Sequence, residues 1–177
     1  MRALLVSTAA VFTLAAAMPA SAVTTIFFAG LSSAGEPVPT STATGAAIVS
    51  FDDVADTVTV QLSFQGLANS SPFGHIHCCT AVPGSGSAPV SLNFTPLPSV
   101  TTGTYSSVFA LTPAAFDALF AGAAAGRAYV NIHTPGTYGG GEIRGFLPAA
   151  VPEPGSYALM LAGLGVLGWA ARQRRAA

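Results

Sequence analysis

The sequence Thr57-Val-Thr-Val-Gln-Leu-Ser-Phe64 decides the fold, because apolar and polar residues alternate along it without a break. The apolar positions are Val58, Val60, Leu62 and Phe64. A period of two places one set of side chains in a core and the other in water, which is typical of a half-buried β-strand. The apolar run 45–51 and the acidic turn 52–56 precede it, so the whole stretch predicts a β-hairpin.

Further strands are predicted on both sides of this hairpin. Runs rich in β-branched and aromatic residues occupy positions 24–28, 90–94, 103–110, 127–134 and 142–147. Gly, Ser and Pro separate them, as expected for turns. Segment 32–39 contains two prolines, which favour an extended or edge segment over a helix. Seven or eight short strands predict an all-β fold, an antiparallel sandwich or barrel.

One short helix is predicted in the body of the chain, over residues 112–120. Thr112 is expected as the N-cap and Pro113 as the first helical residue, and Gly122 is expected to end the helix. Phe116, Leu119 and Phe120 follow the helical spacing and provide an apolar stripe that can pack on the sheet.

The charge distribution excludes nucleic-acid partners. The chain has 177 residues, of which 7% are charged, and it contains no lysine. Between residues 23 and 150, two arginines stand against six acidic residues. Binding to nucleic acid depends on Lys and Arg side chains that neutralise phosphates, and this body offers almost none.

Residues 1–22 are predicted to be a secretory signal peptide. Arg2 supplies the positive start, residues 3–17 form an apolar segment, and Ala20-Ser21-Ala22 matches a cleavage site. The alternative is an uncleaved membrane anchor. We expect the Sec translocon and signal peptidase to act here, so that the mature chain begins near Val23 in an oxidising compartment where a cysteine pair can form a disulfide.

The C-terminal segment 150–177 has three distinct parts. Val151-Pro152-Glu153-Pro154 is followed by the uncharged run 157–171 and then by Arg172, Arg174 and Arg175. As a helix the run spans roughly 22 Å, short of a hydrocarbon core of roughly 30 Å. It is still predicted to be a transmembrane helix with its arginines in the cytoplasm, since it has no polar face that would suit an amphipathic docking helix.

This layout resembles the PEP-CTERM sorting signal of Gram-negative bacteria. In that family an exosortase, a membrane-bound cysteine transpeptidase, recognises and removes the tail. The resemblance implies export across the inner membrane, a transient anchor there, and release or attachment at the cell surface. Such proteins are associated with cells that produce exopolysaccharide and form biofilms.

The body between the two ends, residues 23–149, resembles the CHRD domain. The motifs that carry the resemblance are Gly35-Glu36-Pro37-Val38-Pro39, Gly45, Gly74-His75-Ile76-His77, Tyr129-Val130-Asn131-Ile132-His133-Thr134 and Gly141-Glu142-Ile143-Arg144-Gly145. Two departures are Phe146, where a Gln is expected, and the order Glu-Pro-Val-Pro in the first motif. The resemblance implies an immunoglobulin-like or superoxide-dismutase-like β-sandwich.

The three histidines of the chain suggest a metal site. On a strand, His75 and His77 share one face, together with Cys79 if the strand continues that far. His133 shares a face with Tyr129 and Asn131 on another strand. If these faces meet, the three imidazoles suit copper or zinc, with Cys79 or water as a fourth ligand. The alternative is that the histidines only hydrogen-bond their neighbours.

The adjacent Cys78 and Cys79 are the only cysteines, which leaves three states open. They can form a vicinal disulfide, remain free thiols, or cross-link to another chain. Glu142 and Arg144 are predicted to form a surface or inter-strand ion pair. The acidic turn 52–56 is interpreted as solvated, since it lacks the regular spacing of a calcium loop.

Two classes of function follow. The first is a non-enzymatic surface protein that binds or scaffolds in the envelope or in the exopolysaccharide matrix. The second is a copper- or zinc-binding or redox protein that uses His75, His77 and His133. Superoxide dismutase activity is not expected, because that enzyme needs a larger histidine set and an aspartate for its dinuclear centre.

Overall fold

The structure is a computed structural model that describes residues 23–148, except positions 37, 39, 71 and 95, together with 160–167 and Arg172. The predicted signal peptide 1–22, with Ala20 and Ala22, lies outside the described residues. The same holds for most of the sorting segment, namely Val151, Pro152, Glu153, Pro154, Arg174 and Arg175. Residues 160–167 are helical and exposed. Within the described ranges, no helix has the length and apolar character needed to cross a membrane.

Eight strands, one 3-10 turn and one α-helix make up the described body. Their bounds are β1 Thr24–Ser32, η1 Ser33–Gly35, β2 Thr44–Asp52, β3 Thr57–Gln65, β4 Phe73–His77, β5 Val90–Phe94, β6 Gly103–Ala110, α1 Pro113–Ala124, β7 Tyr129–His133 and β8 Ile143–Phe146. The predicted bounds of β5 and β6 agree with the structure. The extended segment predicted before Pro37 instead contains the turn η1.

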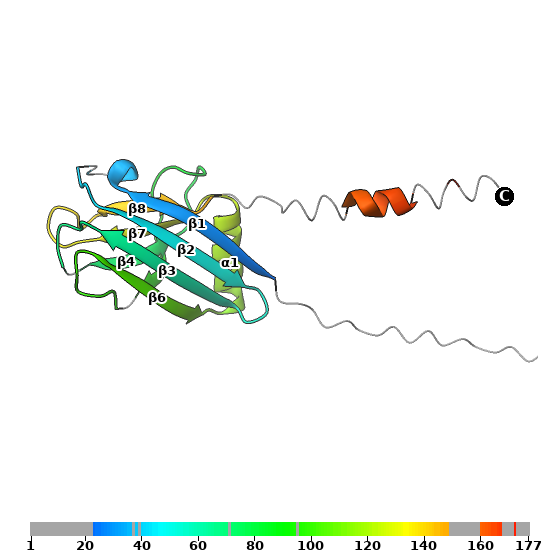
Figure 1. Cartoon of the computed structure of the whole chain (residues 1–177), viewed down its shortest axis with the longest axis horizontal. Coiled ribbons are helices and arrows are strands. Elements are labelled where there is room, and N and C mark those ends of the chain that lie inside the picture. Colours follow the sequence, from blue (N-terminus) through cyan, green and yellow to red (C-terminus); the bar gives the residue numbers. More distant parts are fainter. Residues whose placement is uncertain are drawn as a thin grey trace, which may run out of the picture.

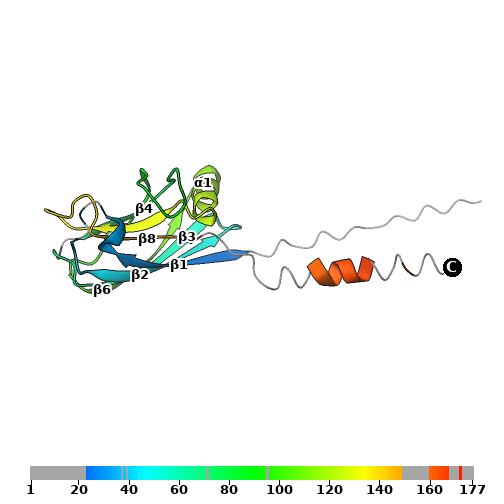
Figure 2. The same cartoon turned by 90° about the horizontal axis from the view of Figure 1, so that it is seen from above.

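The strands form one antiparallel sheet that folds over into two layers (Figures 1 and 2). The strand order is β5-β4-β7-β8-β1-β2-β3-β6. We name β1, β2, β3 and β6 the hairpin layer, and β5, β4, β7 and β8 the histidine layer. Between the layers, β1 and β8 pair at a single position, Ser32 opposite Arg144, which is where the sheet turns.

The two edges of the sheet come close to each other and nearly close it. Phe94 on β5 packs against Tyr105 and Phe109 on β6, with ring centroids 5.9 and 6.1 Å apart. No hydrogen-bonded pairing of β5 with β6 occurs among the described residues. The predicted all-β antiparallel sandwich is therefore confirmed, as a single sheet bent over its own core.

The alternating stretch that predicts the hairpin fills this core. Val58, Val60, Leu62 and Phe64 are all buried, and β3 pairs with β2 over its full length. Helix α1 covers one end, where Phe51 makes edge contacts with Phe116 and Phe120. Burial of apolar side chains from both layers and from α1 is the main stabilising contribution.

The helix begins as predicted but ends later. The Thr112 side chain accepts a hydrogen bond from the Ala115 amide, and Pro113 is the first helical residue. The prediction that Gly122 ends the helix is wrong, because α1 continues to Ala124. Gly122 is instead a contact residue: a Cβ atom there would overlap the sulfur atoms of Cys78 and Cys79.

Candidate metal centre

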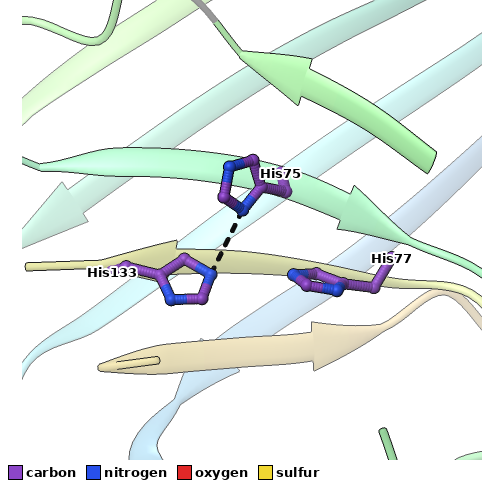
Figure 3. A group of neighbouring side chains, drawn as sticks. All are labelled: His75, His77 and His133. Carbon is purple, nitrogen blue, oxygen red and sulfur yellow. Dashed lines mark hydrogen bonds between the residues drawn. The ribbon is translucent and has the colours of Figure 1, made fainter. Parts of the chain in front are cut away.

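The register between β4 and β7 brings the three histidines together. Phe73 pairs with His133, His75 with Asn131, and His77 with Tyr129. Because side chains alternate along both strands, the histidines share the outer face of the histidine layer. One imidazole nitrogen from each lies within 4.8 Å of the other two, and the His75 Nδ1 to His133 Nε2 distance is 3.3 Å (Figure 3).

Backbone carbonyl groups orient two of the three rings. His77 Nδ1 lies 2.8 Å from Ala88 O, and His133 Nδ1 lies 3.1 Å from Gly139 O. A carbonyl oxygen only accepts, so both Nδ1 atoms donate and both Nε2 atoms keep a lone pair. Histidines that bind metals are commonly oriented in this way by a hydrogen bond from the other ring nitrogen.

Aromatic rings hold the same two imidazoles from the side. Phe73 stacks on His133 with centroids 4.9 Å apart, and Tyr129 stacks on His77 at 4.8 Å with planes 2° apart. The Tyr129 hydroxyl also accepts a hydrogen bond of 3.3 Å from the Ala88 amide, the residue whose carbonyl orients His77. The stacked Tyr129 ring therefore fixes the plane of the His77 imidazole, and the hydrogen bond to Ala88 O fixes its rotation within that plane.

A buried ion pair lies behind this aromatic layer. Arg144 donates to Glu36 at 2.6 Å, and its guanidinium carbon lies 4.6 Å from the centroid of the Tyr129 ring. The predicted surface or inter-strand pair between Glu142 and Arg144 is wrong, since Arg144 pairs with Glu36. Glu142 is buried and accepts hydrogen bonds from three groups on separate loops: the Ser41 hydroxyl at 2.7 Å, the Ala68 amide at 2.9 Å and the Thr134 hydroxyl.

Comparison with protein families agrees with the motifs in this site. A model of the CHRD domain matches residues 27–147, which is more than half of the chain. The chain belongs to the CHRD family. A model of the PEP-CTERM protein-sorting motif matches residues 150–175, so the protein is an exported, exosortase-sorted protein of the bacterial cell surface or exterior. Comparison with curated proteins and with solved structures gave no match.

Burial keeps the histidines of this CHRD domain in the neutral form that metal binding requires. Burial lowers the pKa of His133 to about 4, opposed by its hydrogen bond to Gly139 and reinforced by the charges of the other two histidines and Arg144. The pKa of His75 is lowered by burial and by His77. Burial also lowers the pKa of His77.

The guanidinium of Arg144 behind the site is held in its charged form. Burial by itself would lower the pKa of Arg144, but the hydrogen bond and charge of Glu36 raise it overall. The CHRD domain therefore carries a permanent positive charge, balanced by Glu36, next to the Tyr129 ring that supports His77.

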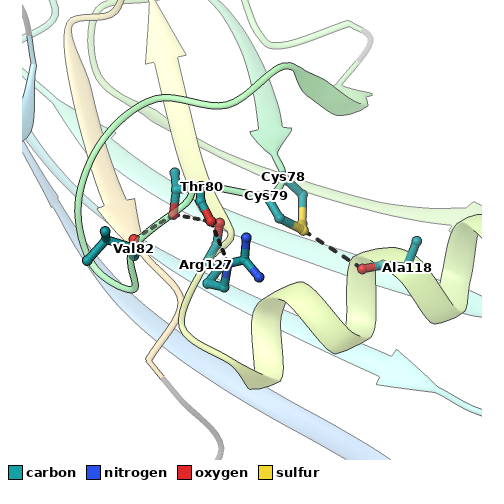
Figure 4. Close-up of a disulfide and its surroundings, with 6 residues drawn as sticks. All are labelled: Cys78, Cys79, Thr80, Val82, Ala118 and Arg127. Carbon is teal, nitrogen blue, oxygen red and sulfur yellow. Dashed lines mark hydrogen bonds between the residues drawn. A yellow bond between two sulfur atoms is a disulfide. The ribbon is translucent and has the colours of Figure 1, made fainter.

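The cysteine pair does not join the histidine cluster. Strand β4 ends at His77, so the alternation that was expected to carry Cys79 onto the same face stops before it. Cys78 and Cys79 are joined to each other by a disulfide, which packs on helix α1 with Cys79 Sγ 3.9 Å from Ala118 O (Figure 4). The expectation of Cys79 as a fourth ligand is therefore wrong.

Sequence reasoning missed the groups that orient the imidazoles. The sequence assigns no partner to the imidazoles, whereas the structure supplies the carbonyl oxygens of Ala88 and Gly139. Every residue has a carbonyl oxygen, so no residue type marks these positions. Of the groups that support the imidazoles, the ring of Tyr129 could have been found in the sequence, since it occupies the same predicted face as His133.

Proposed function

We propose that this exported CHRD protein binds one copper or zinc ion at the cell envelope through His75, His77 and His133. The supporting observation is the set of three imidazole nitrogens within 4.8 Å of one another. Metal–nitrogen bonds of about 2.0–2.1 Å place two ligands of a tetrahedral site about 3.3 Å apart. The distance between His75 Nδ1 and His133 Nε2 is 3.3 Å.

A cluster that existed only for hydrogen bonding would leave one nitrogen without a role. His77 Nε2 is buried and has no hydrogen-bond partner. Buried polar atoms nearly always have a partner, and an orphan atom calls for an explanation such as an ion or a water molecule. A metal ion bound by all three imidazoles supplies that partner and uses the lone pairs that Ala88 and Gly139 leave free.

The proposed role is binding, not catalysis. The chain has three histidines, all of them in this cluster, which accounts for one ion and not for a dinuclear centre. Copper and zinc both accept imidazole nitrogen, so the donor set leaves both metals as candidates. We further propose that the Sec translocon and signal peptidase process residues 1–22, and that the host is a Gram-negative bacterium whose exosortase removes the tail.

A second candidate is a structural role in the envelope or in the exopolysaccharide and biofilm matrix. The outer face of the hairpin layer favours it, because exposed uncharged polar residues lie next to one another there. These are Gln61, Ser63, Thr104 and Ser106. Such side chains can hydrogen-bond the hydroxyl groups of a neutral polysaccharide. This role needs no metal.

Metal stoichiometry separates the two candidates. The full-length protein is purified, stripped with a chelator, reloaded with Cu(II) or Zn(II), and analysed by mass spectrometry for metal content. We expect one ion per chain and a loss of affinity of more than about 100-fold in His77→Ala, above the effect of removing a group that only orients a ligand.

Gln61→Ala is the matched control, because Gln61 is exposed on the other layer and should leave binding unchanged. Equal binding by the wild type and His77→Ala, or no binding tighter than that of an ordinary surface histidine, would refute the metal site. In that case the structural role would stand as the better explanation.

A further inference from the structure

Asn131 lies at the centre of the three histidines although it is not one of the residue types considered for the site. It is directly opposite His75 in the pairing of β4 with β7, and it is two residues from His133 on the same strand. His77 is its diagonal neighbour, since it pairs with Tyr129. Opposite residues on one face have Cβ atoms about 4.5–5.5 Å apart and diagonal ones about 7–8 Å apart.

The side chain of Asn131 has a polar atom without a partner. The residue is 1% exposed, and its Oδ1 atom is buried with no hydrogen bond. Native proteins leave few buried acceptors in this condition, and those that occur commonly mark a water or an ion. Two of the orphaned atoms belong to the site, Asn131 Oδ1 and His77 Nε2, and two more, Arg144 Nε and Glu36 Oε1, belong to the ion pair beside it.

The neighbours of Asn131 indicate which end of its amide is free. Arg144 on β8 is directly opposite Asn131, and Glu36 is bound to Arg144. Asn131 Nδ2 and the Glu36 carboxylate both lie next to the Cα of Gly141, so close that a Cβ atom there would overlap them. A carboxylate accepts and an amide nitrogen donates, so the nitrogen belongs on the Glu36 side. The oxygen is left for a donor elsewhere.

We propose that Asn131 is a further residue of the metal site and that its Oδ1 accepts a hydrogen bond from a water molecule that occupies the fourth position on the metal. The inference rests on the proposed function. Three histidines leave one position of a four-coordinate ion to another ligand. Cys79 does not supply that ligand, because it is joined to Cys78 and lies against α1.

The chemistry of the acceptor selects the kind of ligand. A water molecule on a metal ion is a strong hydrogen-bond donor, because the ion withdraws charge from its oxygen. The amide oxygen only accepts. It therefore stabilises a bound water more than an anion that carries no hydrogen, and Asn131 sets the preference of the site for a protic fourth ligand.

Two substitutions of similar size separate this role from a structural one. Asn131→Leu keeps the number and branching of the side-chain heavy atoms and removes the acceptor and the donor, whereas Asn131→Asp keeps an acceptor, removes the donor and adds a negative charge. Asn93→Leu is the matched control, because Asn93 is the neighbour of His75 on β5 but is exposed. Circular dichroism and thermal melting in a chelator report whether each variant folds, and Asn131→Asp decides the matter if Asn131→Leu does not.

The measurement uses the full-length protein loaded with Cu(II). Electron paramagnetic resonance counts the nitrogen ligands, and electron–nuclear double resonance in light and heavy water detects the exchangeable protons of a bound water. We expect three nitrogens and a bound water in the wild type. Asn131→Leu should keep the nitrogens, shift the exchangeable-proton couplings and bind Cu(II) about 10-fold more weakly. Asn131→Asp should bind it more tightly, and Asn93→Leu should match the wild type.

The outcomes distinguish the two proposals. If Asn131→Leu has the couplings and affinity of the wild type, the role of Asn131 is refuted while the three-histidine site stands. Weaker binding in both Asn131 variants with an unchanged bound water also refutes it, since the amide then has a structural role. A wild-type spectrum without three nitrogens refutes the metal site and the role of Asn131 together.

Discussion

The hairpin layer and the histidine layer differ in what covers their outer faces. In β3 of the hairpin layer, side chains alternate between the core and the exterior. In β7 of the histidine layer, all five residues are buried. The loop before β5 covers that second face, where Gly86 O accepts from Arg144 at 3.1 Å and Ala88 O accepts from His77.

This difference shows where a β-sandwich can hold polar chemistry. A sheet face open to water can carry Ser, Thr and Gln at little cost, and their environment barely changes on folding. A covered face removes polar groups from water, so each one needs a partner. Glu36, Arg144 and the histidines meet that requirement in part, through contacts with one another and with loop carbonyls, whereas His77 Nε2 and Asn131 Oδ1 have no partner.

The largest difference in stability between the two layers is expected from loss of the buried ion pair. Arg144→Ala leaves the Glu36 carboxylate buried and unpaired, which should lower the free energy of unfolding by about 3–5 kcal/mol. Gln61→Ala on the open face should change it by no more than about 0.5 kcal/mol. Urea unfolding followed by circular dichroism gives both values. Similar losses in the two variants would show that the layers do not differ in this respect.

The pH dependence of stability should come next in size. The pKa of His133 is lowered from its ordinary value of 6.5 to about 4 in the folded protein. Between these values the unfolded chain binds a proton that the folded chain does not, so stability is present above pH 6.5 and falls as the pH drops toward 4. A shift of this size corresponds to about 3 kcal/mol.

The test compares the chelator-treated wild type with His133→Leu by urea unfolding at several pH values. The stability of the wild type relative to the variant should decrease between pH 6.5 and pH 4. Thr59→Ala, on the outer face of the hairpin layer, should keep the slope of the wild type. Equal slopes for the wild type and His133→Leu would mean that His133 is not desolvated.

The smallest change in stability is expected on the outer face of the hairpin layer. Phe28 is 64% exposed on the outer side of β1, so Phe28→Ser removes little buried area. The free energy of unfolding should change by no more than about 0.5 kcal/mol. Urea unfolding checks this, and Phe27→Ser is the comparison, since Phe27 is buried in the core and its loss should be several-fold larger. A large loss from Phe28→Ser would show that this face is covered as well.

The sequence predicted the elements well where local rules decide them. The hairpin follows from a period of two, β5 and β6 follow from apolar runs between turn residues, and the start of α1 follows from Thr112 and Pro113. It failed where a distant contact overrides the local rule. Gly122 is a helix stop by local rules, but the disulfide packed against it explains the glycine, and the helix continues.

The site could be predicted only in part. The alternation rule correctly placed His75 and His77 on one face, and the second motif placed His133 on a face with Asn131. Whether these two faces lie on the same side of the sheet depends on the register of β4 with β7. That register pairs residues about 58 positions apart in the chain. The partner of Arg144 was missed for the same reason, since Glu36 is 108 residues away.

The sequence by itself determined most of the strands, the sorting signal at the C-terminal end and the residue types available for chemistry. These depend on side-chain periodicity and composition, which act over a few residues. Only the tertiary structure decided that the three imidazoles converge, that Asn131 lies among them and that Cys79 turns away. Those outcomes depend on strand register and on the loop that covers the histidine layer, and both are set by packing between segments that are distant along the chain.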